Sequence, residues 1–136
     1  MKTLIVDDDI TSRKIMQAML APFGECALAA NGGEAIELFR AEMEKLSLFD
    51  LVCLDIMMPG VSGHDVLKAI RAIEEENGIF PPRAAKVIMT SALSDSENIL
   101  GSFSNQCEAY LIKPVEYEQL VAQINLLDLG MEAALK

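Results

Sequence analysis

Short apolar runs alternate five times with longer segments of helical periodicity along this chain. In the longer segments, apolar residues recur three or four positions apart, which is the spacing of one face of an α-helix. Strands that alternate with helices form parallel sheets with right-handed crossovers and helices on both faces. We therefore expect an α/β fold, a five-stranded doubly wound parallel sheet with five helices in a three-layer sandwich. The expected strands are residues 4–6, 26–29, 51–54, 86–90 and 109–112, and the expected helices begin near residues 11, 31, 63, 94 and 116.

Each expected helix has one apolar face. Ile15 lies on the apolar face of the first helix, and Leu46 completes that of the second. The acidic residues 74–76 should extend the third helix into solvent. Two adjacent prolines then make residues 79–85 an irregular connection, for which local packing is the expected role. Gly130 stands where a C-terminal cap of the last helix is expected.

Composition limits the size and the partners of this fold. A chain of 136 residues that is 51% hydrophobic suits one domain, expected at residues 1–130 with a short tail at 131–136. A net charge of −10 argues against direct binding of nucleic acid or of a membrane surface. No apolar run reaches the roughly 18 residues of a spanning helix. Cys26, Cys53 and Cys107 form no CxxC pair, so we expect neither disulfides nor zinc, and a cytoplasmic location.

Polar residues end four of the five expected strands. Asp7 and Asp8 follow the first, Asp55 the third, Ser91 the fourth and Lys113 the fifth. The carboxyl ends of parallel strands share one edge of the sheet, so these groups should meet there. Three carboxylates raise one another's pKa, and Mg²⁺, which prefers oxygen ligands, would relieve that repulsion. With an ammonium and a hydroxyl beside them, the carboxylates suit a site that receives a phosphoryl group.

Four segments of the chain together resemble the receiver domains of two-component response regulators. These segments are residues 4–9, 54–63, 87–92 and 110–114, and the resemblance extends over essentially residues 2–130. It implies a flavodoxin-like fold and a single-domain regulator similar to the chemotaxis regulators. It also implies a phosphoryl donor, either a histidine kinase or a histidine phosphotransfer protein, and a downstream protein target. We expect a monomer or weak dimer that modifies only itself and is otherwise no enzyme.

The resemblance also implies roles for individual residues. Thr90 and Ser91 are adjacent hydroxylic residues, and the family pattern of Ser or Thr followed by Ala selects Ser91. A tyrosine in a strand often only packs, so the role of Tyr110 rests on the resemblance alone. The implied roles are phosphoacceptor for Asp55, Mg²⁺ coordination for Asp7, Asp8, Asp55 and the backbone carbonyl of Met57, phosphoryl contact for Lys113, and switch residues for Ser91 and Tyr110.

Other functions remain open at this point. One alternative is a pseudo-receiver that binds proteins without being phosphorylated, and another is a receiver fragment of a larger regulator or hybrid kinase. A phosphatase with an aspartyl nucleophile would need a second Asp two residues after Asp55, where Met57 stands. A flavin carrier has the same topology, but the first strand here leads into an acidic loop without a phosphate cradle.

Overall fold

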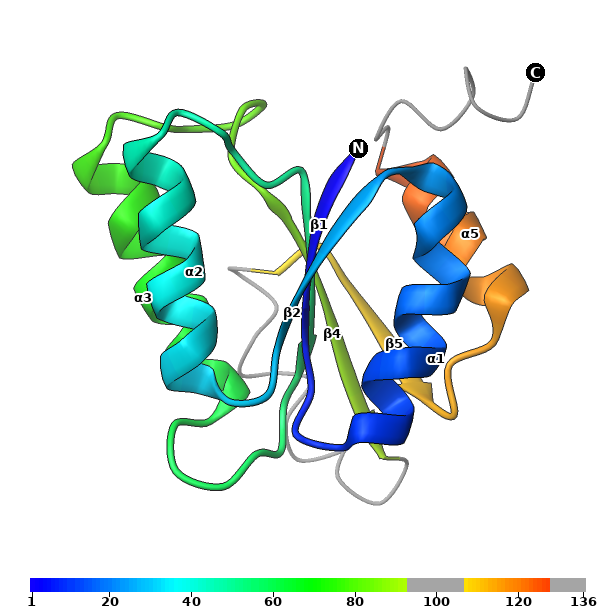
Figure 1. Ribbon diagram of the computed structural model, residues 1–136. Coiled ribbons are helices and arrows are strands. Elements are labelled where there is room, and N and C mark those ends of the chain that lie inside the picture. Colours follow the sequence, from blue (N-terminus) through cyan, green and yellow to red (C-terminus); the bar gives the residue numbers. More distant parts are fainter. Residues whose placement is uncertain (93–106, 128–136) are drawn as a thin grey trace.

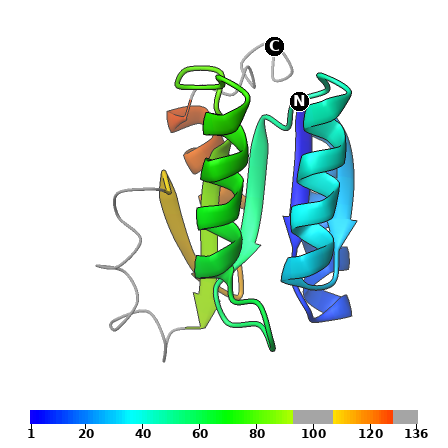
Figure 2. The same ribbon diagram turned by 90° about the vertical axis from the view of Figure 1, so that its left-hand side faces the viewer.

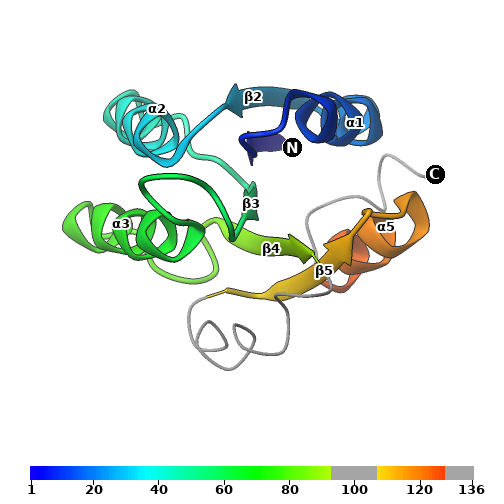
Figure 3. The ribbon, with the colours of Figure 1, turned by 90° about the horizontal axis from the view of Figure 1, so that it is seen from below.

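A single parallel sheet forms the centre of the molecule. The computed structural model describes residues 1–92 and 107–127, and its strands follow the order β2-β1-β3-β4-β5. Helices α2 and α3 cover one face, and α1 and α5 cover the other (Figures 1 and 3). The elements are β1 (Lys2–Val6), α1 (Ile10–Leu20), the 3-10 turn η1 (Ala21–Phe23), β2 (Glu25–Ala29), α2 (Gly32–Glu44), β3 (Leu51–Asp55), α3 (Gly63–Glu76), β4 (Lys86–Ala92), β5 (Ala109–Lys113) and α5 (Tyr117–Leu126).

These elements confirm the expected doubly wound α/β sandwich. All five strands pair in parallel, and four of the five expected helices are present. The helix expected to begin near residue 94 lies outside the described residues, as do Gly130 and the tail at 131–136. The domain boundary at residue 130 therefore stays a prediction. No helix in the described ranges is long and apolar enough to cross a membrane.

Two apolar layers hold the helices on the sheet. Strand β3 is buried along its whole length because it lies in the middle of the sheet. Its side chains alternate between the layers, so Leu54 faces the cluster under α2 and α3 while Cys53 faces the cluster under α1 and α5. Figure 2 shows α2 and α3 side by side in front of the sheet.

Ile15 does not lie on the buried face of α1 as expected, although Leu20 does. Asp9 caps the helix by accepting the Thr11 N–H, and the buried positions are then Met16 and Leu20, which lie four residues apart. Ile15 is 49% exposed, so its assignment to the buried face was wrong. Ile15 and Met16 are adjacent apolar residues, so the sequence alone does not show which of them faces the sheet. The packing of α1 on the sheet buries Met16 and leaves Ile15 exposed.

Leu46 does not pack on α2 as expected but ends the helix in a left-handed turn. Its φ is 58° and its side chain is 82% exposed. The Ser47 N–H donates to the Glu42 carbonyl and the Leu46 N–H to the Met43 carbonyl, which together make a Schellman motif. This position normally holds glycine, because a Cβ is strained there.

We predict that Leu46→Gly stabilises the protein by about 1 kcal/mol, since it relieves the strain without losing a buried contact. Urea denaturation measures the change. Glu37→Gly is the matched control, because Glu37 is an exposed residue inside the same helix with right-handed backbone. It should lose about 1 kcal/mol. A loss in both variants would contradict the assignment of strain to Leu46.

The connection from α3 to β4 differs most from expectation. Glu74 was expected in solvent, yet it is only 3% exposed. Its carboxylate accepts Arg71 Nη1 at 2.8 Å and the backbone N–H of Ala85 at 2.7 Å. Arg71 also holds Glu108, just before β5, through Nη2 contacts of 2.9 and 3.1 Å. The Arg71 guanidinium thus links α3 to the residues just before β4 and β5. Through Glu74 and Ala85 it also holds the end of the irregular connection between α3 and β4 in place.

Candidate functional site

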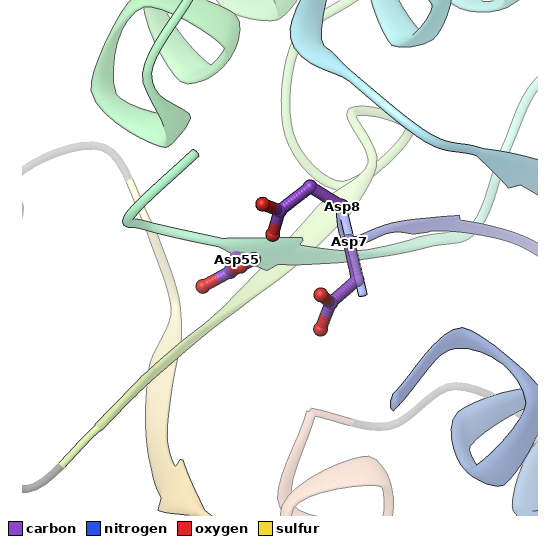
Figure 4. A group of neighbouring side chains, drawn as sticks. All are labelled: Asp7, Asp8 and Asp55. Atoms are coloured by element: carbon purple, nitrogen blue, oxygen red, sulfur yellow. The ribbon is translucent and has the colours of Figure 1, made fainter. Parts of the chain in front are cut away.

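Three carboxylates meet where β1 and β3 end. These strands are neighbours, with Val6 beside Leu54, so the residues that follow β1 lie next to Asp55, the last residue of β3. One carboxylate oxygen from each of Asp7, Asp8 and Asp55 lies within 4.8 Å of the others (Figure 4). Asp7 and Asp55 are buried, whereas Asp8 is exposed. The acid cluster is therefore anchored in the sheet and open to solvent on one side.

Lys113 brings an ammonium to this cluster from the far edge of the sheet. It is the last residue of β5, and β4 separates that strand from β3. Lys113 Nζ lies 2.9 Å from Asp7 Oδ2 and 3.3 Å from Asp55 Oδ2. One cation therefore contacts both buried acids at once.

The ammonium only partly offsets the charge of the acids. The pKa of Asp55 is raised to about 6, because burial and the charge of Asp7 together outweigh the opposing effect of Lys113. Burial lowers the pKa of Lys113, but the hydrogen bond to Asp7 and the charge of Asp55 outweigh it, so this pKa is raised overall. Lys113 thus stays protonated at neutral pH. Three carboxylates facing one ammonium leave net negative charge for a second cation.

Backbone and side-chain contacts fix the orientation of the acids. Asp7 Oδ1 accepts the Asp9 N–H at 2.9 Å, and Arg13 Nη1 donates to the backbone carbonyl of Asp7 at 2.8 Å. Asp55 Oδ1 lies 3.4 Å from the N–H of Met57, in the loop after β3. The contact of Arg13 with Asp7 could not be predicted from the sequence, because an arginine one turn into a helix carries no signal of its own.

A buried hydroxyl lies near the same edge. Ser91 is 1% exposed, and its Oγ has no hydrogen-bond partner among the described residues. A buried hydroxyl without a partner costs free energy, so Ser91 is free, as far as the described residues show, to donate to a group bound at the site. Thr90 is also buried, and Tyr110 is half-buried against the apolar layer under α2 and α3.

A hollow of about 410 Å³ opens beside the cluster, between α1 and the segment that follows β5. Asp7 and Lys113 form its polar wall, and Ile15, Pro114 and Val115 contribute apolar surface. The exposed position of Ile15 on α1 thus becomes part of the entrance to the site.

The donor set fits a hard divalent cation. Asp7, Asp8 and Asp55 offer only oxygen ligands, which suits Mg²⁺, and Asp8 faces the solvent from which such an ion would arrive. The backbone of Met57 lies next to Asp55 and could add a carbonyl oxygen.

Comparisons with known proteins agree with this geometry. A family model described as response regulator receiver domain matches residues 3–125. The probable transcriptional regulator ycf27 of Guillardia theta is 34% identical over 124 residues, which is 90% of this chain. The match covers only 43% of that relative, so this chain spans less than half of the relative's length.

Solved structures similar to this chain are also response regulators or their receiver domains. The response regulator protein TrrA from Thermotoga maritima, in complex with Mg²⁺ and BeF, has a TM-score of 0.68 and 30% identity, covering 93% of this chain and 97% of that one. The receiver domain of Ssk1 from Saccharomyces cerevisiae was crystallised with the histidine phosphotransfer protein Ypd1. That structure has a TM-score of 0.77 and 26% identity, covering 98% of this chain and 91% of that one.

Proposed function

This chain belongs to the response regulator receiver domain family, and from that membership we propose that it accepts a phosphoryl group on Asp55 in a two-component phosphorelay. As a receiver it is part of a signalling system rather than an enzyme that turns over a substrate. The observation that carries the proposal is the position of Asp55. It is a buried carboxyl with a pKa near 6, beside two further acids and one ammonium.

In the proposed reaction, a carboxylate oxygen of Asp55 attacks the phosphorus of a phosphohistidine. The new O–P bond forms as the P–N bond breaks, and the imidazole nitrogen keeps the electron pair of that bond. Lys113 Nζ, 3.3 Å from Asp55, is placed to pair with a phosphoryl oxygen. The Ser91 hydroxyl, which has no partner among the described residues, can donate to another. Water later hydrolyses the acyl phosphate and restores Asp55.

Asp7, Asp8, Asp55 and the carbonyl of Met57 are the groups that would hold Mg²⁺. When bound, the ion supplies positive charge that offsets the phosphoryl oxygens. The TrrA structure supports this proposal, because that receiver carries Mg²⁺ together with BeF. Asp7 also contacts Lys113, so its carboxylate would hold the metal and position the ammonium at once.

We assign the donor to the class of histidine kinases or histidine phosphotransfer proteins. The Ypd1–Ssk1 complex supports this class. The hollow beside Asp7 and Lys113, with its apolar wall at Ile15 and Val115, suits an imidazole flanked by apolar side chains of the donor. After transfer, movement of Ser91 and Tyr110 would change a protein-binding face, so the downstream target is a protein. We place the chain in the cytoplasm as a monomer or weak dimer.

The test is labelling with a small phosphodonor, such as radiolabelled acetyl phosphate, in Mg²⁺ buffer. Wild type should gain an acid-stable, hydroxylamine-labile label that chelation of Mg²⁺ prevents. Asp55→Ala should show only background labelling, because it removes the carboxylate oxygen that attacks phosphorus in the proposed reaction. Glu37→Ala, which changes an exposed acid of α2, should label like wild type. Equal labelling of wild type and Asp55→Ala would overturn the proposal, and an unlabelled wild type would favour the pseudo-receiver.

A further inference from the structure

Two glycines outside the acid cluster touch the loop that follows Asp55. This loop, residues 56–62, joins β3 to α3 and passes beneath the start of α2 (Figures 1 and 3). Gly32 is the first residue of α2 and is buried. A Cβ built on Gly32 would lie 2.7 Å from both Cβ and Cγ1 of Val61 and 2.8 Å from its carbonyl oxygen. The backbone of α2 therefore packs directly on Val61.

Gly63 makes the corresponding contact at the other end of the loop. It is the first residue of α3, and a Cβ there would collide with the backbone carbonyl oxygen of Asp55. The same Cβ would lie 2.7 Å from the Cα of Ile56. The Gly63 N–H donates to the Ile56 carbonyl at 3.0 Å. The start of α3 thus rests on the backbone of the proposed phosphoacceptor.

Space, rather than backbone conformation, requires glycine at both positions. The positive-φ glycines among the described residues are Gly24, Gly60 and Gly78, so neither Gly32 nor Gly63 has the left-handed backbone that excludes other residues. In a helix without neighbours, alanine would be the more stable residue. The packing against the loop is therefore the reason for the missing side chain.

We propose that Gly32 is a positioning residue for the metal ligand in this loop. The inference rests on the proposed function, in which the carbonyl of Met57 binds Mg²⁺. The loop is held at its start by the approach of the Met57 N–H to Asp55 Oδ1 and by Met58, which is buried in the apolar layer under α2 and α3. At its end, Gly63 packs on Asp55 and Ile56. The contact of Gly32 with Val61 supports the exposed span between them, residues 59–61.

The burial pattern shows which side would move if Gly32 gained a side chain. Helix α2 is held on the sheet by the buried residues Ala35, Phe39 and Met43. Val61 is 37% exposed and lies in a surface loop. A methyl group at position 32 would therefore push Val61 outward rather than lift the helix. The fold would stay in place while the Met57 carbonyl lost its position.

The test compares Gly32→Ala with Gly33→Ala, which adds the same methyl group one residue later in the same helical turn. A Cβ at Gly33 meets only Asn31 Oδ1, at 3.5 Å, which is an ordinary contact. Titration calorimetry with Mg²⁺ alone should give about tenfold weaker binding for Gly32→Ala, the size expected when the support of a metal ligand is lost. Gly33→Ala should bind as wild type does.

Amide hydrogen exchange of the metal-free protein provides the second readout. Exchange in residues 56–62 should be faster in Gly32→Ala than in Gly33→Ala, while the core strands stay equally protected. A role limited to stability would lower the melting temperature without changing the Mg²⁺ affinity of the folded protein. If Gly32→Ala does not fold, Val61→Ala removes part of the same contact from the loop side and should shift both readouts in the same direction.

The outcomes separate this inference from the proposed function. Wild-type Mg²⁺ affinity and loop exchange in Gly32→Ala, or in Val61→Ala if that variant has to be used, would overturn the positioning role. Labelling of Asp55 would be unaffected by that result. A wild type that binds Mg²⁺ but never labels would refute the phosphoacceptor function and leave the role of Gly32 intact.

Discussion

Replacement of Lys113 with alanine is expected to slow phosphorylation of Asp55 by about 10²- to 10³-fold, the usual loss when one preorganised donor to a transition state is removed. Lys113 is the cation that contacts both buried acids, at 2.9 Å from Asp7 and 3.3 Å from Asp55. Without it, the incoming phosphoryl oxygens would face three carboxylates with no fixed ammonium beside them. Labelling rates at saturating Mg²⁺ measure the effect.

The control for this variant is Lys14→Ala, which removes an exposed ammonium from α1. It should label at the wild-type rate, which would show that losing one positive charge from the protein does not by itself slow labelling. Lys113→Arg keeps the charge and should recover part of the rate. If Lys113→Ala labels as fast as wild type, Lys113 has no part in the transfer.

We also expect the loss of folding stability in Lys113→Ala to depend on pH. Burial and Asp7 raise the pKa of Asp55 to about 6 against the opposing effect of Lys113, so Lys113→Ala should raise it further. A raised carboxyl pKa favours the folded state when protonated, and this contribution is lost as the pH rises through the folded pKa. Lys113→Ala should therefore be least destabilised near pH 4 and most destabilised above pH 6. Urea denaturation across this range tests the sign, and a loss that is constant with pH would contradict it.

Arg71→Ala should lower the free energy of unfolding by about 3 to 5 kcal/mol, because it leaves a buried carboxylate without its cation. The side chain of Glu74 is 4% exposed and accepts Arg71 Nη1 at 2.8 Å. The same guanidinium holds Glu108 through Nη2 and donates to the Ala85 carbonyl at 2.9 Å. Urea denaturation measures the loss.

The effect should be large because both carboxylates also bind backbone. Glu74 accepts the Ala85 N–H at 2.7 Å, and Glu108 accepts the Val87 N–H at 2.7 Å. These contacts bring the chain into β4, so a displaced carboxylate would disturb the start of that strand. Glu74 and Glu108 thus accept the backbone N–H groups of Ala85 and Val87 at the start of β4.

Arg40→Ala is the matched control. Arg40 lies 3.7 Å from Glu76 in an exposed ion pair, with side chains 53% and 63% accessible, and such pairs contribute at most about 1 kcal/mol. Arg71→Met combined with Glu74→Gln should recover part of the loss, because no charge is then buried alone. A loss in Arg71→Ala as small as that in Arg40→Ala would show that Glu74 finds another partner or is solvated.

The sequence predicts the fold and the meeting of the acids for one physical reason. Buried strands are read from their apolar runs, and the carboxyl ends of parallel strands share one edge, so Asp7, Asp8 and Asp55 had to converge. The same rule predicts that Lys113, at the end of β5, lies beside these acids. These residues could be assigned to one site without knowing any side-chain contact.

Other features depend on contacts that no local pattern reveals. Glu74 was placed in solvent because it begins an acidic run, whereas its burial depends on Arg71 and on Glu108, 37 residues beyond Arg71. Leu46 was assigned to an apolar face by spacing alone, but the helix ended before that spacing applied. The requirement for glycine at position 32 comes from Val61, which becomes its neighbour only in the folded protein.

The order of the strands along the chain also determines when the complete site can form during synthesis. Asp7, Asp8 and Asp55 lie in the first half of the chain, whereas Lys113 is the last residue of β5, the strand at one edge of the sheet. A growing chain therefore contains all three acids long before it contains their ammonium. Phosphorylation of Asp55 at the full rate, as proposed, would then require β5 to have joined β4. A nascent or truncated chain without that strand would hold the acids but would accept a phosphoryl group about as slowly as Lys113→Ala.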